Sequence, residues 1–176
     1  EIYFHLLLQN LIYNIYMQNY NSIRNKFINS WLFKDKLFWI TFPSVFIFDQ
    51  ITKYLVYSNM YLGESIPESA FIRITYARNT GTAFSLFRSY GDILLYLSIF
   101  VAVFFTIYFI FIEKPKFFMR LFISLVVAGA LGNILDRIRF GYVNDFIDVG
   151  SWPIFNIADS SISIAITIYI VDTLIL

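Results

Sequence analysis

The sequence predicts an all-α membrane protein with four transmembrane helices and a small extracytoplasmic β element. Of its 176 residues, 59% are hydrophobic and only 14% are charged. The mean hydropathy of +0.66 lies far from that of an average soluble domain. In addition, four apolar runs each approach the roughly 20 residues that a helix needs to cross a bilayer.

These four runs are predicted as membrane spans, and the basic residues around them predict their orientation. Lys and Arg are concentrated before the first run and between the second and third runs. By the positive-inside rule these flanks face the cytoplasm, which places both termini inside. The four predicted spans are Leu37 to Val56, Ile93 to Ile112, Phe117 to Leu135 and Ile154 to Ile175. The basic residues are Arg24, Lys26, Lys34, Lys36, Lys114, Lys116 and Arg120.

The remaining segments divide the chain further. The outer connection, about residues 57–92, is too long for a simple turn, and Phe71 to Tyr76 alternates as a half-buried strand does. Residues 1–36 are interpreted as an N-terminal tail before a transmembrane domain, residues 37–176. The tail's apolar stretch from Ile2 to Met17 is interrupted by polar residues and is short for a span. Because the chain opens with Glu1, either an upstream extension or a true start at Met17 would explain it.

Two aspartates, Asp145 and Asp159, lie in short polar runs at the predicted outer ends of membrane helices. A carboxylate at the edge of a bilayer is costly unless function uses it, so the pair predicts a functional site. Asp145 is expected on a loop or short turn. Asp159 is expected where the last span begins, and there a structural carboxylate stabilised by the helix dipole is the alternative interpretation.

Two carboxylates a few ångströms apart cannot both ionise cheaply, so one keeps a proton while the other acts as a base. The charged member can activate water and the neutral one can polarise a peptide carbonyl, which is aspartic protease chemistry. The chain has no Cys and a single His, His5 in the tail, which excludes a thiol nucleophile, a His triad and a zinc site of several His. We expect no metal and no cofactor. A net charge of +1 gives no sign of a nucleic-acid partner.

Other polar residues occur at helical spacing. Asp49 and Lys53 are placed i, i+4, which predicts an ion pair that either reaches the outer interface or contacts substrate. Asn133, Asp136 and Arg137 fall on one face of the third span, where Asp136 and Arg137 are interpreted as a structural clamp.

Two shorter motifs complete the set. Asn79 and Gly81 form a turn signal in which the glycine permits a positive φ. Asn156 precedes Asp159 by three residues, so its amide is expected to orient that carboxylate.

Together these motifs resemble those of lipoprotein signal peptidase, also called signal peptidase II. They occur in the family's order and rough spacing, from about residue 38 to residue 175. In sequence they read Asp49-Gln50-Ile51-Thr52-Lys53, Asn79-Thr80-Gly81-Thr82-Ala83-Phe84, Gly132-Asn133-Ile134-Leu135-Asp136-Arg137, Gly141-Tyr142-Val143-Asn144-Asp145-Phe146-Ile147 and Phe155-Asn156-Ile157-Ala158-Asp159.

The resemblance implies a bacterial inner-membrane aspartyl endopeptidase that cuts the signal peptide from a prolipoprotein just before its diacylglyceryl-modified cysteine. It implies Asp145 and Asp159 as the catalytic dyad, and a fold of four spans with an extracytoplasmic β-cradle. Thr82 departs from the family, in which Ala is commoner, and the connection between the two aspartates is shorter than in many members. The implied partners are lipid-modified signal peptides and membrane lipids. The implied supporting or substrate-binding residues are Asp49, Lys53, Asn79, Gly81, Asn133, Asp136, Arg137 and Asn156.

Two other functions remain open from the residues alone. Charged side chains inside a membrane also build transporters and proton relays, although neither an internal repeat nor a pair of Gly/Pro-interrupted spans is visible. A membrane scaffold that binds a partner helix is the second alternative. It predicts that Asp145→Asn and Asp159→Asn leave function intact, whereas a protease loses its activity with either.

Overall fold

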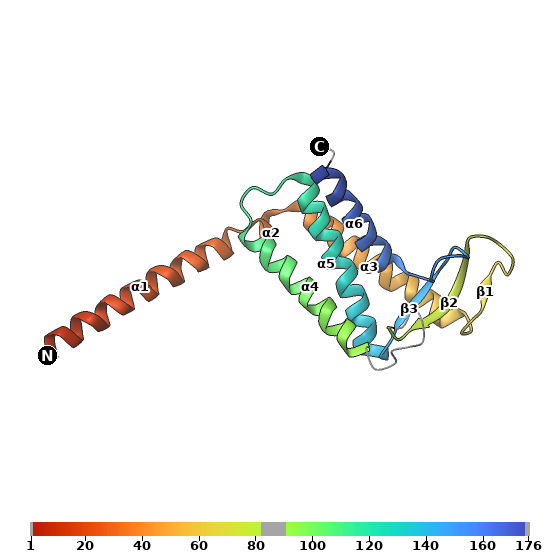
Figure 1. Cartoon of the computed structure of the whole chain (residues 1–176), viewed down its shortest axis with the longest axis horizontal. Coiled ribbons are helices and arrows are strands. Elements are labelled where there is room, and N and C mark those ends of the chain that lie inside the picture. Colours follow the sequence, from red (N-terminus) through yellow and green to blue (C-terminus); the bar gives the residue numbers. More distant parts are fainter. Residues whose placement is uncertain (1, 82–90, 175–176) are drawn as a thin grey trace.

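The computed structural model describes residues 2–81 and 91–174 and consists there of a helical bundle with a small sheet at one end (Figure 1). The helices are α1 (Ile2–Ile28), α2 (Trp31–Lys34), α3 (Lys36–Asn59), α4 (Gly91–Phe111), α5 (Phe117–Phe140) and α6 (Ile157–Leu174). The strands are β1 (Ser65–Ile66), β2 (Arg73–Asn79) and β3 (Val143–Asp148).

Helix α5 is the centre of the bundle, since it contacts α3, α4 and α6. In its most apolar stretch 67% of the residues are buried, against 11% for α4 and 17% for α6. Close packing of α5 on α6 requires a glycine, because a Cβ at Gly129 would lie 2.5 Å from the carbonyl oxygen of Ala158 and 2.5 Å from Ser161 Oγ. The apolar outer faces of α4 and α6 fit a lipid environment.

Within residues 2–81 and 91–174, three helices are long and apolar enough to cross a membrane: Ile93–Phe111 of α4, α5 and α6. The corresponding three predicted spans are therefore confirmed as candidates. The first predicted span forms helix α3, which is 24 residues long but is not among the three, so its crossing of the membrane stays a prediction.

The three strands form an antiparallel sheet in the order β1-β2-β3. This sheet confirms the predicted small β element. Strand β2 confirms the strand that the alternation from Phe71 to Tyr76 predicted. In the register of β2 and β3, Ala77 lies opposite Asp145 and Asn79 opposite Val143. The sheet lies at the end of α3 and α5, where α6 begins (Figure 1).

Strand β3 corrects one prediction, because Asp145 lies in a strand and not in a loop or turn. Strand β3 comes soon after helix α5. That helix ends at Gly141, whose φ of 77° is left-handed. Five of the six β3 residues are buried, so both faces are covered and no polar–apolar alternation marks the strand in the sequence. After β3 the chain turns back, and Phe155 hydrogen-bonds Ile147 in both directions at 2.7 and 3.1 Å.

The segment interpreted as a tail contains a long helix, α1, which extends away from the bundle in Figure 1. Asp35 joins the next segments to the core. One of its carboxylate oxygens accepts the backbone N–H of Phe38 at the start of α3 (2.9 Å), and the other accepts Nη1 of Arg120 on α5 (2.9 Å). The division of the chain at residue 36 stays a prediction.

Candidate active site

The ammonium group of Lys53 lies at the centre of a buried polar cluster between α3 and α5. Its Nζ is 2.9 Å from Asp49 Oδ2, 3.5 Å from Asp136 Oδ2 and 3.0 Å from Asn133 Oδ1. The side chain is 1% exposed. Lys53 and Asp49 do form the predicted i, i+4 pair. Its burial contradicts the alternative in which the pair extends to the outer interface, while the alternative of substrate contact stays a prediction.

The carboxylate of Asp49 connects three helices. Besides Lys53 on its own helix, it accepts the backbone N–H of Ala158 on α6 at 2.9 Å through Oδ1. Its Oδ2 accepts Nε2 of Gln50 at 3.1 Å, and the same nitrogen donates to the carbonyl oxygen of Gly132 on α5 at 3.2 Å. A Cβ at Gly132 would lie 2.6 Å from Asp49 Oδ2, so this approach of α3 to α5 depends on the glycine.

Asp136 connects the helices to the sheet. Its Oδ2 accepts both the backbone N–H of Asn144 (2.9 Å) and the Asn144 side-chain amide (3.1 Å). The expected clamp between Asp136 and Arg137 is wrong, because the cation paired with Asp136 is Lys53. Asn144 is a site residue that sequence reasoning missed, although it directly precedes Asp145; its burial in a strand covered on both faces carries no sequence signal.

The two aspartates are linked through a pair of asparagines. Asn156 Nδ2 donates to Asp145 Oδ1 at 2.6 Å, and Asn133 Nδ2 donates to Asp159 Oδ1 at 2.7 Å. The asparagines contact each other, Nδ2 of Asn156 donating to Oδ1 of Asn133 at 3.2 Å. Asn156 therefore orients Asp145, and not Asp159 as expected. Its own Oδ1 accepts the backbone N–H of Asp159 at 2.9 Å, which helps to start α6.

The surroundings of Asp145 favour its protonated form. Burial, together with the negative charge of Asp159, raises the pKa of Asp145 from its usual 3.8 to about 7, while hydrogen bonds from Asn79 and Asn156 and the charge of Lys53 oppose the rise. Asp145 is 1% exposed, whereas Asp159 is only half-buried and lines a cavity. The two carboxylates therefore differ in their environment.

Asn79 and Gly81 form the turn that the sequence predicted at the end of β2. Gly81 has a φ of 99°, and its backbone N–H donates to Asn79 Oδ1 at 2.9 Å. The rest of this motif, Thr82 to Phe84, lies outside the described residues.

Two arginines lie on the elements around the aspartates, and in the part of the chain that the structure describes neither forms an ion pair with Asp145 or Asp159. Arg137 is half-buried on α5, and its positive charge attracts the carboxylates of Asp145 and Asp159. Farther out, Arg78 donates through Nε to the Tyr76 hydroxyl at 3.0 Å, and that hydroxyl donates to Asn144 Oδ1 at 3.3 Å.

A cavity of about 520 Å³ opens beside Asp159. Its walls come from the β3–α6 connection and from the outer face of α6, and most of them are apolar. The exposed ring of Trp152 stands in one wall. The cavity is lined by Val149, Trp152, Phe155, Asp159, Ser160, Ser163 and Ile164.

The described side chains offer carboxylate, amide and guanidinium chemistry. Within residues 2–81 and 91–174, no group of three His, Asp or Glu side chains is arranged to hold a metal ion. A carboxyl whose pKa is raised, next to a second carboxylate that faces a cavity, can bind water between an acid and a base.

Comparisons with known proteins agree with these features. Residues 41–175 match the family described as signal peptidase (SPase) II. A lipoprotein signal peptidase of Syntrophus aciditrophicus (strain SB) is 42% identical over 148 residues, which is 77% of this chain and 91% of that protein. One from Dehalococcoides mccartyi (strain CBDB1) is 38% identical over 134 residues, 74% of this chain and 84% of that protein.

Two solved bacterial membrane enzymes have a similar fold. One, determined by the in meso method at 2.3 Å, superposes with a TM-score of 0.70 at 38% identity and covers 78% of this chain and 87% of its own. The other, determined at 1.9 Å, has a TM-score of 0.71 at 36% identity and covers 78% and 92%.

Removal of the buried cation should unfold the bundle readily. Lys53→Met leaves Asp49 and Asp136 without their counter-ion, and we expect a loss of about 3–5 kcal/mol in the free energy of unfolding. Addition of Asp49→Asn to this variant should restore part of the loss. The measurement is denaturant or thermal unfolding in a mild detergent.

The matched control is Arg73→Ala, which breaks a partly exposed ion pair with Asp148 (2.6 Å) and should cost less than about 1 kcal/mol. Equal losses for Lys53→Met and Arg73→Ala would contradict the central role of Lys53.

The raised pKa of Asp145 should make the free energy of unfolding fall as the pH rises. Between about pH 4 and 7 the folded protein keeps the proton on Asp145, because its pKa is raised to about 7, while the unfolded chain has released it. Asp145→Asn should therefore stabilise the protein above pH 7, by at most about 4 kcal/mol, and have little effect near pH 4. Unfolding of both proteins across this pH range measures it.

The control is Asp148→Asn, whose effect on the free energy of unfolding should be opposite to that of Asp145→Asn. The hydrogen bond from Arg73 lowers the pKa of Asp148, so Asp148→Asn should destabilise at neutral pH and lose its effect as the pH falls below about 4. An Asp145→Asn effect that does not change with pH would be the contrary result.

Proposed function

This chain belongs to the signal peptidase II family, and we propose that it is an aspartyl endopeptidase of the bacterial inner membrane. In this proposal it removes the signal peptide from diacylglyceryl-modified prolipoproteins by cleavage just before the lipidated cysteine. Asp145 and Asp159 are the catalytic dyad.

One observation carries the proposal: two carboxyl groups that are linked through a pair of asparagines have different environments, and one of them lines an apolar cavity. Asp145 is buried and held by Asn156 (2.6 Å), while Asp159 is held by Asn133 (2.7 Å) and lines the cavity. Oδ1 of each aspartate accepts one of these amide bonds, and a carboxylate has a second oxygen with which it can bind water or substrate.

The reaction needs no covalent enzyme intermediate. Ionised Asp159 accepts a proton from a water molecule, and the water oxygen attacks the peptide carbonyl carbon while protonated Asp145 donates its proton to the carbonyl oxygen. The resulting gem-diol collapses, the C–N bond breaks, and the proton on Asp159 passes to the leaving nitrogen. A gem-diol proton returns to Asp145, and both carboxyls regain their starting states. The dyad titrates as a unit, so a pH–rate profile reports on the pair.

The cavity beside Asp159 suits a peptide that carries a lipid. A signal peptide enters as a helix whose carbonyl groups are hydrogen-bonded, and it must unwind locally before attack. Polar groups such as Asn133, Asn156 and Arg137 can hold the freed backbone. The substrate's acyl chains would remain in the bilayer and help to select the bond that meets the dyad, so an unlipidated substrate should be cut much more slowly. Equal cleavage of lipidated and unlipidated substrate would count against this role of the lipid.

In the proposed orientation, α3 crosses the membrane together with α4, α5 and α6, and both termini are cytoplasmic. The sheet then forms the extracytoplasmic β-cradle, and the dyad lies near the outer face. The concentration of basic residues before α3 and between α4 and α5 supports this orientation.

Substitution of either aspartate should abolish cleavage of a diacylglyceryl prolipoprotein. Asp145→Asn and Asp159→Asn each remove a group that transfers a proton, and we expect at least a 10²- to 10⁴-fold loss of rate. A gel-shift assay with purified protein in lipid measures the loss, and unfolding curves establish that both variants are folded.

Asp172→Asn is the matched control, because this aspartate lies near the other end of α6 and should retain the wild-type rate. The proposal would be contradicted if well-folded wild-type protein failed to cut several lipidated substrates, or if the Asp145 and Asp159 variants stayed active. Either result would favour the transporter or scaffold alternative.

A further inference from the structure

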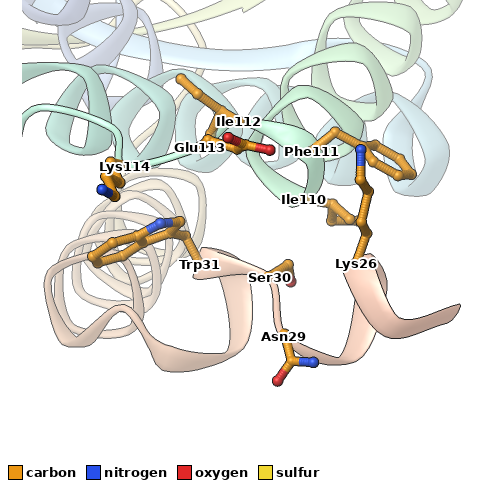
Figure 2. Close-up of a pocket in the computed structure, with 9 residues that line it drawn as sticks. All are labelled: Lys26, Asn29, Ser30, Trp31, Ile110, Phe111, Ile112, Glu113 and Lys114. Atoms are coloured by element: carbon orange, nitrogen blue, oxygen red, sulfur yellow. The ribbon is translucent and has the colours of Figure 1, made fainter. Parts of the chain in front are cut away.

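A second cavity, of about 310 Å³, lies where the end of α1, the start of α2 and the α4–α5 connection meet (Figure 2). It is at the end of the bundle remote from the sheet (Figure 1), and it shares no residue with the candidate active site. It is lined by Lys26, Asn29, Ser30, Trp31, Ile110, Phe111, Ile112, Glu113 and Lys114.

One wall of this cavity holds a buried hydroxyl group that the described protein leaves unused. Ser30 is 4% exposed, and its Oγ has no hydrogen-bond partner among the described residues. The hydroxyl does not cap α2 either, although Ser30 immediately precedes that helix. Because a buried hydroxyl without a partner is unfavourable, this group points to a ligand that accepts a hydrogen bond.

The charges around the cavity favour an anion. Lys26 comes from α1 and Lys114 from the α4–α5 connection, and Figure 2 shows them on opposite sides of the cavity with Glu113 between them. Neither lysine forms an ion pair in the described part of the chain. Lys114 is also held at a φ of 49°, in the left-handed region that lysine rarely adopts. Two cations and one anion leave the cavity with a net positive charge.

The position of the cavity favours a lipid over a soluble anion. Ile110 and Phe111 form the last turn of membrane helix α4, so the cavity lies at the depth of the headgroups if α4 spans the bilayer. Trp31 stands in the wall with the guanidinium of Arg120 5.8 Å from its ring centroid, and a tryptophan of this kind is typical of the interface.

We propose that this cavity binds the phosphate-bearing headgroup of an anionic phospholipid, with Ser30 Oγ donating a hydrogen bond to a phosphate oxygen and Lys26 and Lys114 balancing its charge. The acyl chains lie along the apolar surface next to α4. The proposal does not depend on the peptidase activity; only the leaflet, which is the cytoplasmic one, follows from the orientation proposed above.

The test is a titration of full-length protein in a neutral detergent, with binding followed by native mass spectrometry and by thermal unfolding. The probes are phosphatidylglycerol, phosphatidylcholine, diacylglycerol and inorganic phosphate. We expect phosphatidylglycerol alone to bind and to raise the melting temperature. Ser30→Ala should weaken this binding by about tenfold or more, the usual effect of losing one hydrogen bond to a charged group, and should not lower the stability of the lipid-free protein, because it removes an unpaired buried hydroxyl.

Lys26→Gln with Lys114→Gln should weaken phosphatidylglycerol binding at least as much. The matched control is Lys36→Gln with Lys116→Gln, which makes the same change of charge on the same flank at exposed residues outside the cavity and should bind normally. Three results would each contradict the proposed lipid site. They are equal weakening by the control pair, equal binding of phosphatidylcholine, and wild-type binding by the Ser30→Ala protein. Inorganic phosphate binding as tightly as phosphatidylglycerol would replace the lipid with a soluble anion and overturn the proposal.

Discussion

The buried ammonium group of Lys53 is the interaction on which the rest of the site depends. A cation without water is costly, and its position is fixed by the three groups that replace that water: Asp49, Asp136 and Asn133. Through Asp136 it determines where β3 joins the bundle, and through Asn133 it orients the carboxylate that lines the cavity. The helix contacts and the positions of both aspartates therefore share one origin.

The network also makes two chemically identical groups different. Asp145 belongs to a strand covered on both faces, where burial and its neighbour's negative charge raise its pKa. Asp159 lies in the first turn of α6 beside an open cavity. The sheet and the bundle each supply one member of the pair, since Asp145 lies on β3 and Asp159 on α6.

Much of this arrangement could be predicted from the sequence. The long apolar runs predicted α4, α5 and α6, and alternation predicted β2. The polar motifs predicted the ion pair of Asp49 with Lys53 and the turn at Asn79 and Gly81. What failed depended on tertiary contacts. Strand β3 is buried on both faces and shows no period, and Lys53 pairs with Asp136 across helices although Arg137 is adjacent in sequence. Likewise, the side-chain amide of Asn156 donates to Asp145, and it is the amide of Asn133 that donates to Asp159.

The claim that Asp145 and Asp159 act together on a peptide carbonyl is tested most directly by a structure of the protein with a peptide whose scissile bond is replaced by a hydroxyethylene group. Such a hydroxyl mimics an oxygen of the gem-diol and binds where transition-state charge develops. Our account predicts that the hydroxyl lies within hydrogen-bond distance of both carboxyls, with the peptide in the cavity beside Trp152. A hydroxyl that contacts neither aspartate, or a peptide bound elsewhere on the bundle, would contradict it.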